Sequence, residues 1–424
     1  MTRTEELFLD ALRAFFRQNR ITGENRPDLN VSEEELAGVF RLAGEQHVFP
    51  VIFNTVYAFP AVRSSPSFPA LRQRAMFSAA EEAGKSASFS GLYRALRYAG
   101  LSPLAVKGVL CRAVWPSGHL RVSSDEDLLI RDDEYPAAVR VLTEQGWKQK
   151  NDVSPAPPSV SPADEEAPTC VTENTDESWF RNGWVIELHR ALFPASNGAV
   201  DRLNDEFGDP FEAPTSYSVE NGTEVLSLSP EKHLLYLILH AFKHFIHSGF
   251  GIRQVCDVGL WADAYSAEID FSSLCRSCER THTLLFAKSL FLIARDVTGR
   301  PIPLPPEWES LSVDPAPMLA DILSGGVFGS NDLARLHSAP ITLDAVEHPS
   351  NHSSPLLSSL FPPREKLLSS YPELKTHPRR LPLVWVKRAF RYAKSTPSAP
   401  SSSSRTLSLA RSRVELLRFY GIIE

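Results

Sequence analysis

The chain has 424 residues, of which 43% are hydrophobic and 22% are charged. This length suffices for two or three domains, and the composition is that of a globular protein with a proper core rather than a disordered chain. Lys and Arg number 44 against 51 Asp and Glu, which gives a formal net charge of −7. Without an overall basic field, nucleic acid and anionic membrane surfaces are disfavoured as partners.

Residues 1–92 are predicted to form an N-terminal helical region that supports the fold. Helices are expected over 5–20, 32–47 and 68–98, and Ser32 ahead of Glu35 has the spacing of a capping box. The first 20 residues interleave acids with bases and lack the features of a signal peptide. No stretch has the roughly 18 uninterrupted apolar residues that favour a membrane span. We therefore expect a cytoplasmic protein.

A strand, a Lys-Gly turn and a short helix are predicted between residues 104 and 115. Leu104–Val106 is apolar, Lys107 and Gly108 end it, and Val109–Trp115 has the length of two helical turns. A glycine at such a turn lets a phosphate approach the backbone, and the helix N-terminus offers free N–H groups and a favourable dipole. Lys107 adds a positive charge, so the turn is predicted to bind phosphate.

Two carboxylates, Asp125 and Asp127, open the strand predicted at 125–130. Residues two apart in a strand project to the same face, so these side chains stand together. Adjacent like charges are costly unless a cation neutralises them. Mg2+ held by one or two carboxylates plus substrate phosphates is the usual arrangement in phosphoryl transfer, and we predict a Mg2+ site here.

This stretch resembles the uncharacterised nucleotidyltransferases of the DNA polymerase β-like superfamily. Members carry a Lys-Gly turn, an Arg and an Asp-x-Asp-Leu-Leu-Val-like strand, matched here by Lys107-Gly108, Arg121 and Asp125–Ile130. The superfamily usually has Gly-Ser or Gly-Gly at the turn, whereas Val109 follows Gly108 here. The resemblance implies a nucleoside triphosphate bound by Lys107, Gly108, Arg121 and Ser124, with Asp125 and Asp127 as catalytic metal ligands.

Beyond the acid pair, a helix is predicted over 132–146 and a flexible insertion over 151–176. Asn182-Gly183 then separates two apolar runs, the strongest short-range signal for a β-hairpin. The second run places Glu187 and His189 on one face. Nucleotidyl transfer commonly uses a third carboxylate, as metal ligand or as proton acceptor, and Glu187 is the candidate. The family's acidic residue, Leu and His match Glu187-Leu188-His189; the alternative is that Glu187 is an exposed strand residue.

Residues 221–300 are predicted to form a helical domain. Ser229 is a candidate N-cap before Pro230, and four histidines then fall on one helical stripe: His233, His240, His244 and His247. Three interpretations stay open for this stripe, namely metal ligands, a substrate-binding face, and solvated or core-edge histidines. The family has a His-rich helix here followed by an Asp near Asp257, which implies substrate contact for His240, His244 and Asp257, with His189 as a further candidate.

Residues 301–424 are predicted to be a Pro-rich, helical C-terminal region with a polar linker at 395–406 and a final helix at 407–420. The overall prediction is an α+β fold, with a nucleotidyltransferase core over 93–220 whose small mixed sheet is flanked by helices. Its activity would be Mg2+-dependent transfer of a nucleoside monophosphate to an acceptor hydroxyl, with release of pyrophosphate. The acceptor, whether small molecule, sugar or protein, is left open. Two alternatives are a catalytically silent binding or antitoxin-like accessory protein and a metal-dependent phosphohydrolase.

Overall fold

The computed structural model describes residues 1–17, 31–149, 178–193, 201–247 and 249–327. Beyond these it describes positions 335, 342, 346, 364–367, 371, 377–387 and 401–423. The insertion predicted over 151–176 lies outside the described residues.

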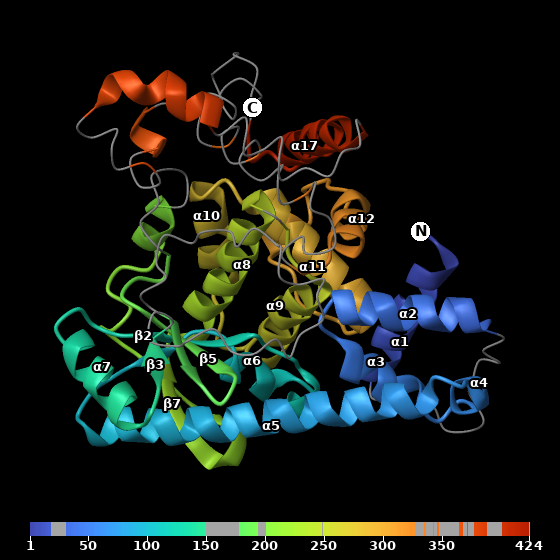
Figure 1. The fold of residues 1–424 in the computed structure, drawn as a ribbon, viewed down its shortest axis with the longest axis horizontal. Helices are drawn as coiled ribbons and strands as arrows, with labels where there is room; N and C mark the ends of the chain where they lie inside the picture. The colour runs from blue at the N-terminus through green and yellow to red at the C-terminus, as the bar shows by residue number, and fades with distance from the viewer. Residues whose placement is uncertain are drawn as a thin grey trace.

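The N-terminal region is helical, as predicted. Its helices are α1 (Arg3–Phe16), α2 (Glu33–Glu45), α3 (Phe49–Val56), α4 (Pro60–Ser64) and α5 (Phe68–Tyr98). The capping box on α2 is present, because Ser32 and Glu35 each accept the backbone N–H of the other. The long helix α5 runs beneath both the sheet and the other N-terminal helices (Figure 1).

Seven strands form one mixed sheet in the order β3-β4-β5-β2-β1-β7-β6. They are β1 (Leu104–Ala105), β2 (Asp125–Leu129), β3 (Lys148–Gln149), β4 (Ser178–Arg181), β5 (Trp184–His189), β6 (Thr215–Val219) and β7 (Thr223–Ser227). At the centre, β2 pairs antiparallel with β1 and parallel with β5. Strands β3, β6 and β7 have no counterpart in the sequence prediction.

The hairpin predicted at Asn182-Gly183 is confirmed between β4 and β5. Asn182 has a φ of 53° and Gly183 a φ of 81°. Positive φ at both central residues is the signature of a type I′ turn, whose twist matches that of the flanking strands. The register that follows buries Ile186 and Leu188 and directs Glu187 and His189 to the opposite face.

Helices cover the sheet and extend beyond it. They are α6 (Val109–Val114), α7 (Tyr135–Glu144), α8 (Pro230–His247), α9 (Ile252–Ala264), α10 (Phe271–Arg280), α11 (Leu284–Thr298) and α12 (Ala316–Gly325). The Tyr93 hydroxyl of α5 donates to the Pro103 carbonyl beside β1 and accepts the N–H of Leu226 in β7. This buried tyrosine therefore fixes α5 against two neighbouring strands.

The C-terminal helix α17 (Ser401–Phe419) begins six residues before its predicted start at Leu407. The part of the predicted linker at 401–406 is therefore helical. Ala410, Val414 and Leu417 are buried at helical spacing. Ser, Thr and Arg cost less than about 0.7 kcal/mol each in a helix, so a helix anchored by that face extends upstream through them.

Two predicted domain boundaries fall within continuous structure. The boundary between residues 92 and 93 lies inside α5, and the boundary at 220 separates β6 from its hairpin partner β7. Most of the buried apolar side chains, from Leu7 to Ile423, form one contiguous cluster, and Leu367, Tyr371 and Val384 form a second, smaller one. The α+β fold class is confirmed, with a mixed sheet and helical regions before and after it. Among the described residues, no helix is both long and apolar enough to cross a membrane.

Candidate active site

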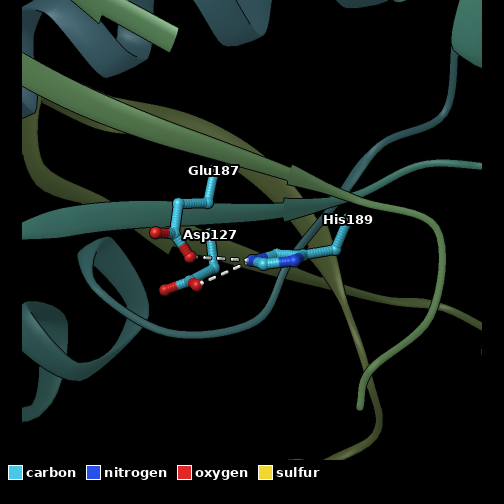
Figure 2. Close-up of side chains that lie close together, drawn as sticks. All are labelled: Asp127, Glu187 and His189. Carbon is cyan, nitrogen blue, oxygen red and sulfur yellow. Dashed lines mark hydrogen bonds and ion pairs between the residues drawn. The ribbon is translucent and has the colours of Figure 1, made fainter. Parts of the chain in front are cut away.

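Three side chains predicted to belong to the site, Asp127, Glu187 and His189, project from the parallel strands β2 and β5. Asp127 is the register partner of Glu187, because the two strands pair residue by residue. His189 lies two residues beyond Glu187 on the same face, and its Nε2 is 3.0 Å from Asp127 Oδ1 and 3.3 Å from Glu187 Oε2. Figure 2 shows the two carboxylates and the imidazole pointing toward one another. The sheet thus places Glu187 beside the acid pair.

Lys107 joins Asp125 to this group. Its Nζ is 2.7 Å from Asp127 Oδ2 and 3.6 Å from Asp125 Oδ1. The lysine follows β1, which pairs with β2, so its side chain crosses the start of the strand that carries both acids. Both aspartates are thus drawn to one cation, and that cation belongs to the protein itself.

The charges of this cluster stabilise one another. Burial alone would lower the pKa of Lys107, but Asp125 and Asp127 raise it well above its ordinary value. Burial would likewise raise the pKa of Asp127, but Lys107 and His189 hold it well below its usual range. Lys107 and Asp127 are therefore charged at neutral pH, although Asp127 is only 3% exposed.

The donor set fits a divalent metal ion. One ligand atom from each of Asp127, Glu187 and His189 lies within 4.8 Å of the others. Carboxylate oxygens suit Mg2+, and a set that also contains imidazole suits Mn2+ or Zn2+. Asp125 lies on the same side through its contact with Lys107. These residues can hold a metal if Lys107 gives way to it.

The predicted phosphate-binding turn differs from expectation in one respect. Val109 opens α6, and its N–H donates to Glu126 Oε2 at 2.8 Å, so this N–H is not free. Glu126 is 1% exposed and also contacts Arg112 Nη2 at 2.6 Å. A β-carbon on Gly108 would lie 2.0 Å from Glu126 Oε2. The missing side chain at Gly108 makes room for an internal carboxylate, which takes the place expected for a phosphate.

Arg121 and Asp257, both predicted to contact substrate, bind each other. The Arg121 Nε and Nη2 atoms donate to the two carboxylate oxygens of Asp257 at 2.7 Å each. Trp115 Nε1 donates to the same carboxylate at 2.8 Å. Burial would raise the pKa of Asp257, but Arg121 holds it below its usual value. The remaining Arg121 Nη1 reaches the Gly108 carbonyl at 3.4 Å, so this pair supports the turn.

Ser124 lies at the rim of the site. It is exposed, and its hydroxyl donates to Asp125 Oδ1 at 3.0 Å. The structure thus brings Ser124 to the acid pair.

The histidines of α8 have separate surroundings. His233 is fully buried, and its Nε2 is 2.9 Å from the Val106 carbonyl; burial lowers its pKa to about 3. His240 and His244 bring their Nε2 atoms within 2.9 Å of each other. Such a contact requires one ring to donate and the other to accept, and burial together with nearby lysines lowers both pKa values well below the ordinary value. His240 alone of these three borders the pocket beside the acid pair.

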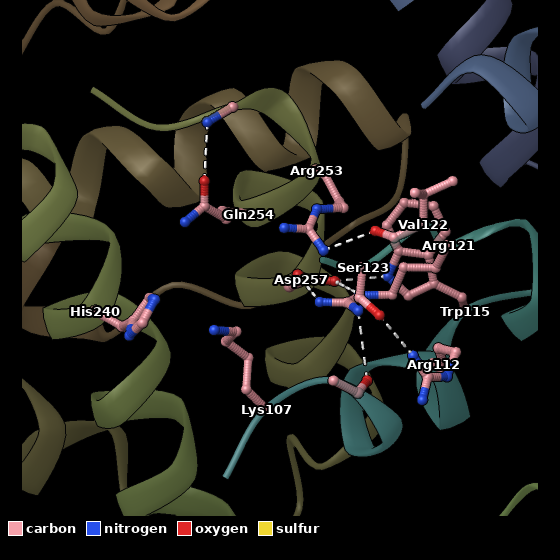
Figure 3. A network of polar contacts seen from close by, with 12 residues as sticks. Lys107, Arg112, Trp115, Arg121, Val122, Ser123, His240, Arg253, Gln254 and Asp257 are labelled. Carbon is pink, nitrogen blue, oxygen red and sulfur yellow. Dashed lines mark hydrogen bonds and ion pairs between the residues drawn. The ribbon is translucent and has the colours of Figure 1, made fainter. Parts of the chain in front are cut away.

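A narrow pocket opens beside Lys107. It is lined by Lys107, Arg121, Asp125, Leu237, His240, Arg253, Gln254 and Asp257. Figure 3 shows Lys107, His240 and Arg253 around it, with the Arg121–Asp257 pair on one side. Asp125 of β2 and Arg253 of α9 therefore line the same cavity.

Sequence reasoning missed a buried charged network behind β2. Glu82 on α5 accepts from Lys85 Nζ at 2.8 Å, from the Ser123 N–H at 3.0 Å and from Arg112 Nη1 at 3.3 Å. The available signal is Glu82 and Lys85 one turn apart on the face of α5 that also carries Phe89. Arg253 was missed as well, although it lies in the same motif as Asp257.

Comparison with known proteins gives one family. The family model described as "Uncharacterised nucleotidyltransferase" matches residues 32–299. The match includes the acid pair, Glu187 and the α8–α9 region. No curated protein and no solved structure matches the chain.

Proposed function

The chain belongs to the uncharacterised nucleotidyltransferase family, and we propose that it transfers a nucleoside monophosphate from a nucleoside triphosphate to an acceptor hydroxyl. The observation that carries the proposal is the convergence of Asp125, Asp127 and Glu187 from two parallel strands beside a lysine and a pocket. Two or three carboxylates on adjacent strands are the arrangement that phosphoryl-transfer sites use to hold Mg2+.

The proposed metal ligands are Asp125, Asp127 and Glu187. When bound, Mg2+ would neutralise charge on the triphosphate and on the entering and leaving oxygens. Lys107 would exchange its carboxylate partners for phosphate oxygens, which keeps its charge compensated throughout. Gly108, Arg121 and Asp257 would hold the turn that carries Lys107, and Ser124 would orient the Asp125 carboxylate.

The acceptor hydroxyl would approach Glu187. This carboxylate is the most exposed of the three acids, with 34% of its side chain accessible, and it lies beside His189. Glu187 would take the proton as the acceptor oxygen forms its bond to the α-phosphorus. The bond from that phosphorus to the oxygen bridging the α- and β-phosphates then breaks, and pyrophosphate leaves. His189 would keep Glu187 and Asp127 apart and oriented.

Thermal stabilisation by nucleotides tests the proposal. ATP, GTP, CTP and UTP are each added with and without Mg2+ to the wild type, to D125N/D127N and to D132N/D133N, which removes the same charge from two exposed aspartates. A ligand that binds the folded state raises the melting temperature. We expect a Mg2+-dependent shift in the wild type and in D132N/D133N, and none in D125N/D127N.

The product distinguishes transfer from the alternatives. Release of pyrophosphate with a candidate acceptor supports nucleotidyl transfer, whereas inorganic phosphate alone supports a phosphohydrolase. If no nucleotide shifts the wild type, the proposal fails and the result favours a binding or accessory protein.

A further inference from the structure

Arg253 is a buried cation that faces the pocket without a carboxylate partner. It is the second residue of α9 and is 2% exposed. Its Nη1 donates to the Val122 carbonyl at 2.7 Å, and its Nε has no hydrogen-bond partner among the described residues. Within that part of the chain no carboxylate lies within 4.0 Å of its guanidinium. The Val122 carbonyl is neutral and does not balance the positive charge.

The other buried arginines of this region are paired. Arg121 makes a two-pronged contact with Asp257, and Arg112 contacts both Glu82 and Glu126. An unpaired buried ion destabilises the fold, because its hydration is lost without compensation. Burial, and then repulsion from Arg121, lower the pKa of Arg253, while Asp257 and Asp125 draw it back at longer range. A guanidinium nevertheless stays charged, so the pocket wall carries an uncompensated positive charge.

We propose that Arg253 forms a polyphosphate subsite that binds an oxygen of the terminal phosphate of the nucleotide, within the part that leaves as pyrophosphate. This inference rests on the proposed function. A guanidinium presents two parallel N–H groups that match phosphate oxygens. Lys107, the Arg121–Asp257 pair and Asp125 line the same pocket, so the subsite adjoins Asp125, one of the three proposed metal ligands.

The size of the pocket agrees with one phosphate oxygen rather than a base. Its interior volume is about 20 Å³, which admits roughly one water-sized group. A terminal phosphoryl oxygen fits such a space, and a purine or a ribose does not. The terminal phosphate would therefore point inward to Arg253, and the nucleoside would lie outside this pocket.

Binding measurements with ligands that lack one part of the nucleotide test the subsite. Titration calorimetry in Mg2+ compares inorganic pyrophosphate, ATP and AMP on wild type, R253Q and R253K. We expect R253Q to weaken pyrophosphate and ATP binding tenfold or more while AMP binding changes less than about threefold. R253K, which keeps the charge but not the planar fork, should recover part of the pyrophosphate affinity.

R121Q serves as the comparison for a paired arginine. This substitution leaves the buried Asp257 carboxylate without its arginine partner. The melting temperature of ligand-free R121Q should therefore fall, whereas that of ligand-free R253Q should be unchanged or higher. Equal affinity of wild type and R253Q for pyrophosphate overturns the inference and leaves the proposed function standing. Arg253-dependent binding of pyrophosphate without binding of any nucleotide supports the subsite and refutes the proposed function. Absence of pyrophosphate binding to the wild type overturns the subsite.

Discussion

Gly108 has a backbone conformation that other residues adopt only with strain, with φ at 53° and ψ at −104°. Its hydrogen atom also faces the Glu126 carboxylate, which contacts the first N–H of α6. Two requirements therefore meet at one position, a positive φ and space for a buried acid. Both residues of the Lys-Gly pair are needed here. The lysine neutralises Asp125 and Asp127, and the glycine, which has no side chain, leaves space for the Glu126 carboxylate.

The first prediction concerns G108A, with G146A as its control. Gly146 also has a positive φ, 81°, but nothing lies within 4 Å of its would-be β-carbon. G146A should therefore show the backbone cost alone, about 1–2 kcal/mol. G108A additionally displaces a buried carboxylate from its hydrogen bond, which costs a further 1–3 kcal/mol or so. Urea denaturation measures both, and equal losses would show that Glu126 moves aside freely.

Lys107 compensates the electrostatic repulsion between the Asp125 and Asp127 carboxylates. The sequence predicts a cation between Asp125 and Asp127, and the structure provides the ammonium group of Lys107 at the position where a metal is proposed. The same side chain can later contact phosphate, because the charge it leaves behind would be replaced by Mg2+. Metal and nucleotide would accordingly bind together more tightly than either alone.

At the scale of elements, the start of β2 is held from behind by α5. Glu82 binds Ser123, which stands two residues before Asp125, and Lys85 and Arg112 balance the charges of Glu82 and Glu126. The network contains two acids and two bases, so it is neutral as a unit. It fixes the strand from which both proposed metal ligands project.

The second prediction is that E82Q destabilises the protein strongly. The amide keeps the shape of Glu82 but leaves two buried cations with one acid, and breaking such a network typically costs about 3–5 kcal/mol. The exposed neighbour Glu81 provides the control, because E81Q removes the same charge on the same helix and should change stability by less than about 0.5 kcal/mol. Chemical denaturation compares the two, and similar stabilities would mean that the network makes no net contribution.

Local signals made part of this architecture predictable. The capping box at Ser32, the Asn182-Gly183 turn and the alternation in β2 and β5 each depend on residues within a few positions of one another. From these the sequence predicts the strands that carry Asp125, Asp127 and Glu187, and parallel pairing in register then brings the acids together.

The parts that sequence reasoning missed depend on distant partners. Glu82 meets Ser123 across 41 positions, and Arg121 meets Asp257 across 136. Whether a charged side chain is a paired core residue or a ligand contact is decided by such partners. For that reason the sequence predicts substrate contact for Arg121, which is paired, and does not distinguish Arg253, which has no carboxylate partner among the described residues.

At the scale of the whole molecule, the N-terminal helices join the site to the later helices. Gln46 accepts the N–H of Ile252 at the start of α9 and donates to the Ile322 carbonyl of α12, each at 2.8 Å. Arg13 of α1 pairs with Asp296 of α11 at 2.8 Å. Residue 252 directly precedes Arg253, so the N-terminal region fixes one wall of the pocket and is part of the same cooperative unit.

Buried and half-buried neutral histidines make this unit sensitive to acid. Burial lowers the pKa of His233 to about 3 and that of His47 and His247 to about 4. An unfolded chain binds these protons near pH 6.5, so below that value it holds more protons than the folded state and stability falls with pH. Asp127 and Asp257 have lowered pKa values, and their contribution persists down to the ordinary aspartate range. The loss of stability expected between about pH 6.5 and pH 4 is therefore due to the histidines.

The third prediction isolates His233 in that window. Its Nδ1 has no partner among the described residues, and its Nε2 meets the Val106 carbonyl, so H233Q can keep a donor to that carbonyl while removing the titration. A group held neutral in the fold gives a slope of up to about 1.4 kcal/mol per pH unit. Between pH 7.5 and 5 the wild type should therefore lose about 2 kcal/mol more unfolding free energy than H233Q, whereas H119Q, at an exposed site, should follow the wild type. Parallel losses in wild type and H233Q by urea denaturation would show that His233 accepts a proton without unfolding, and the acid sensitivity would then be assigned to the other histidines.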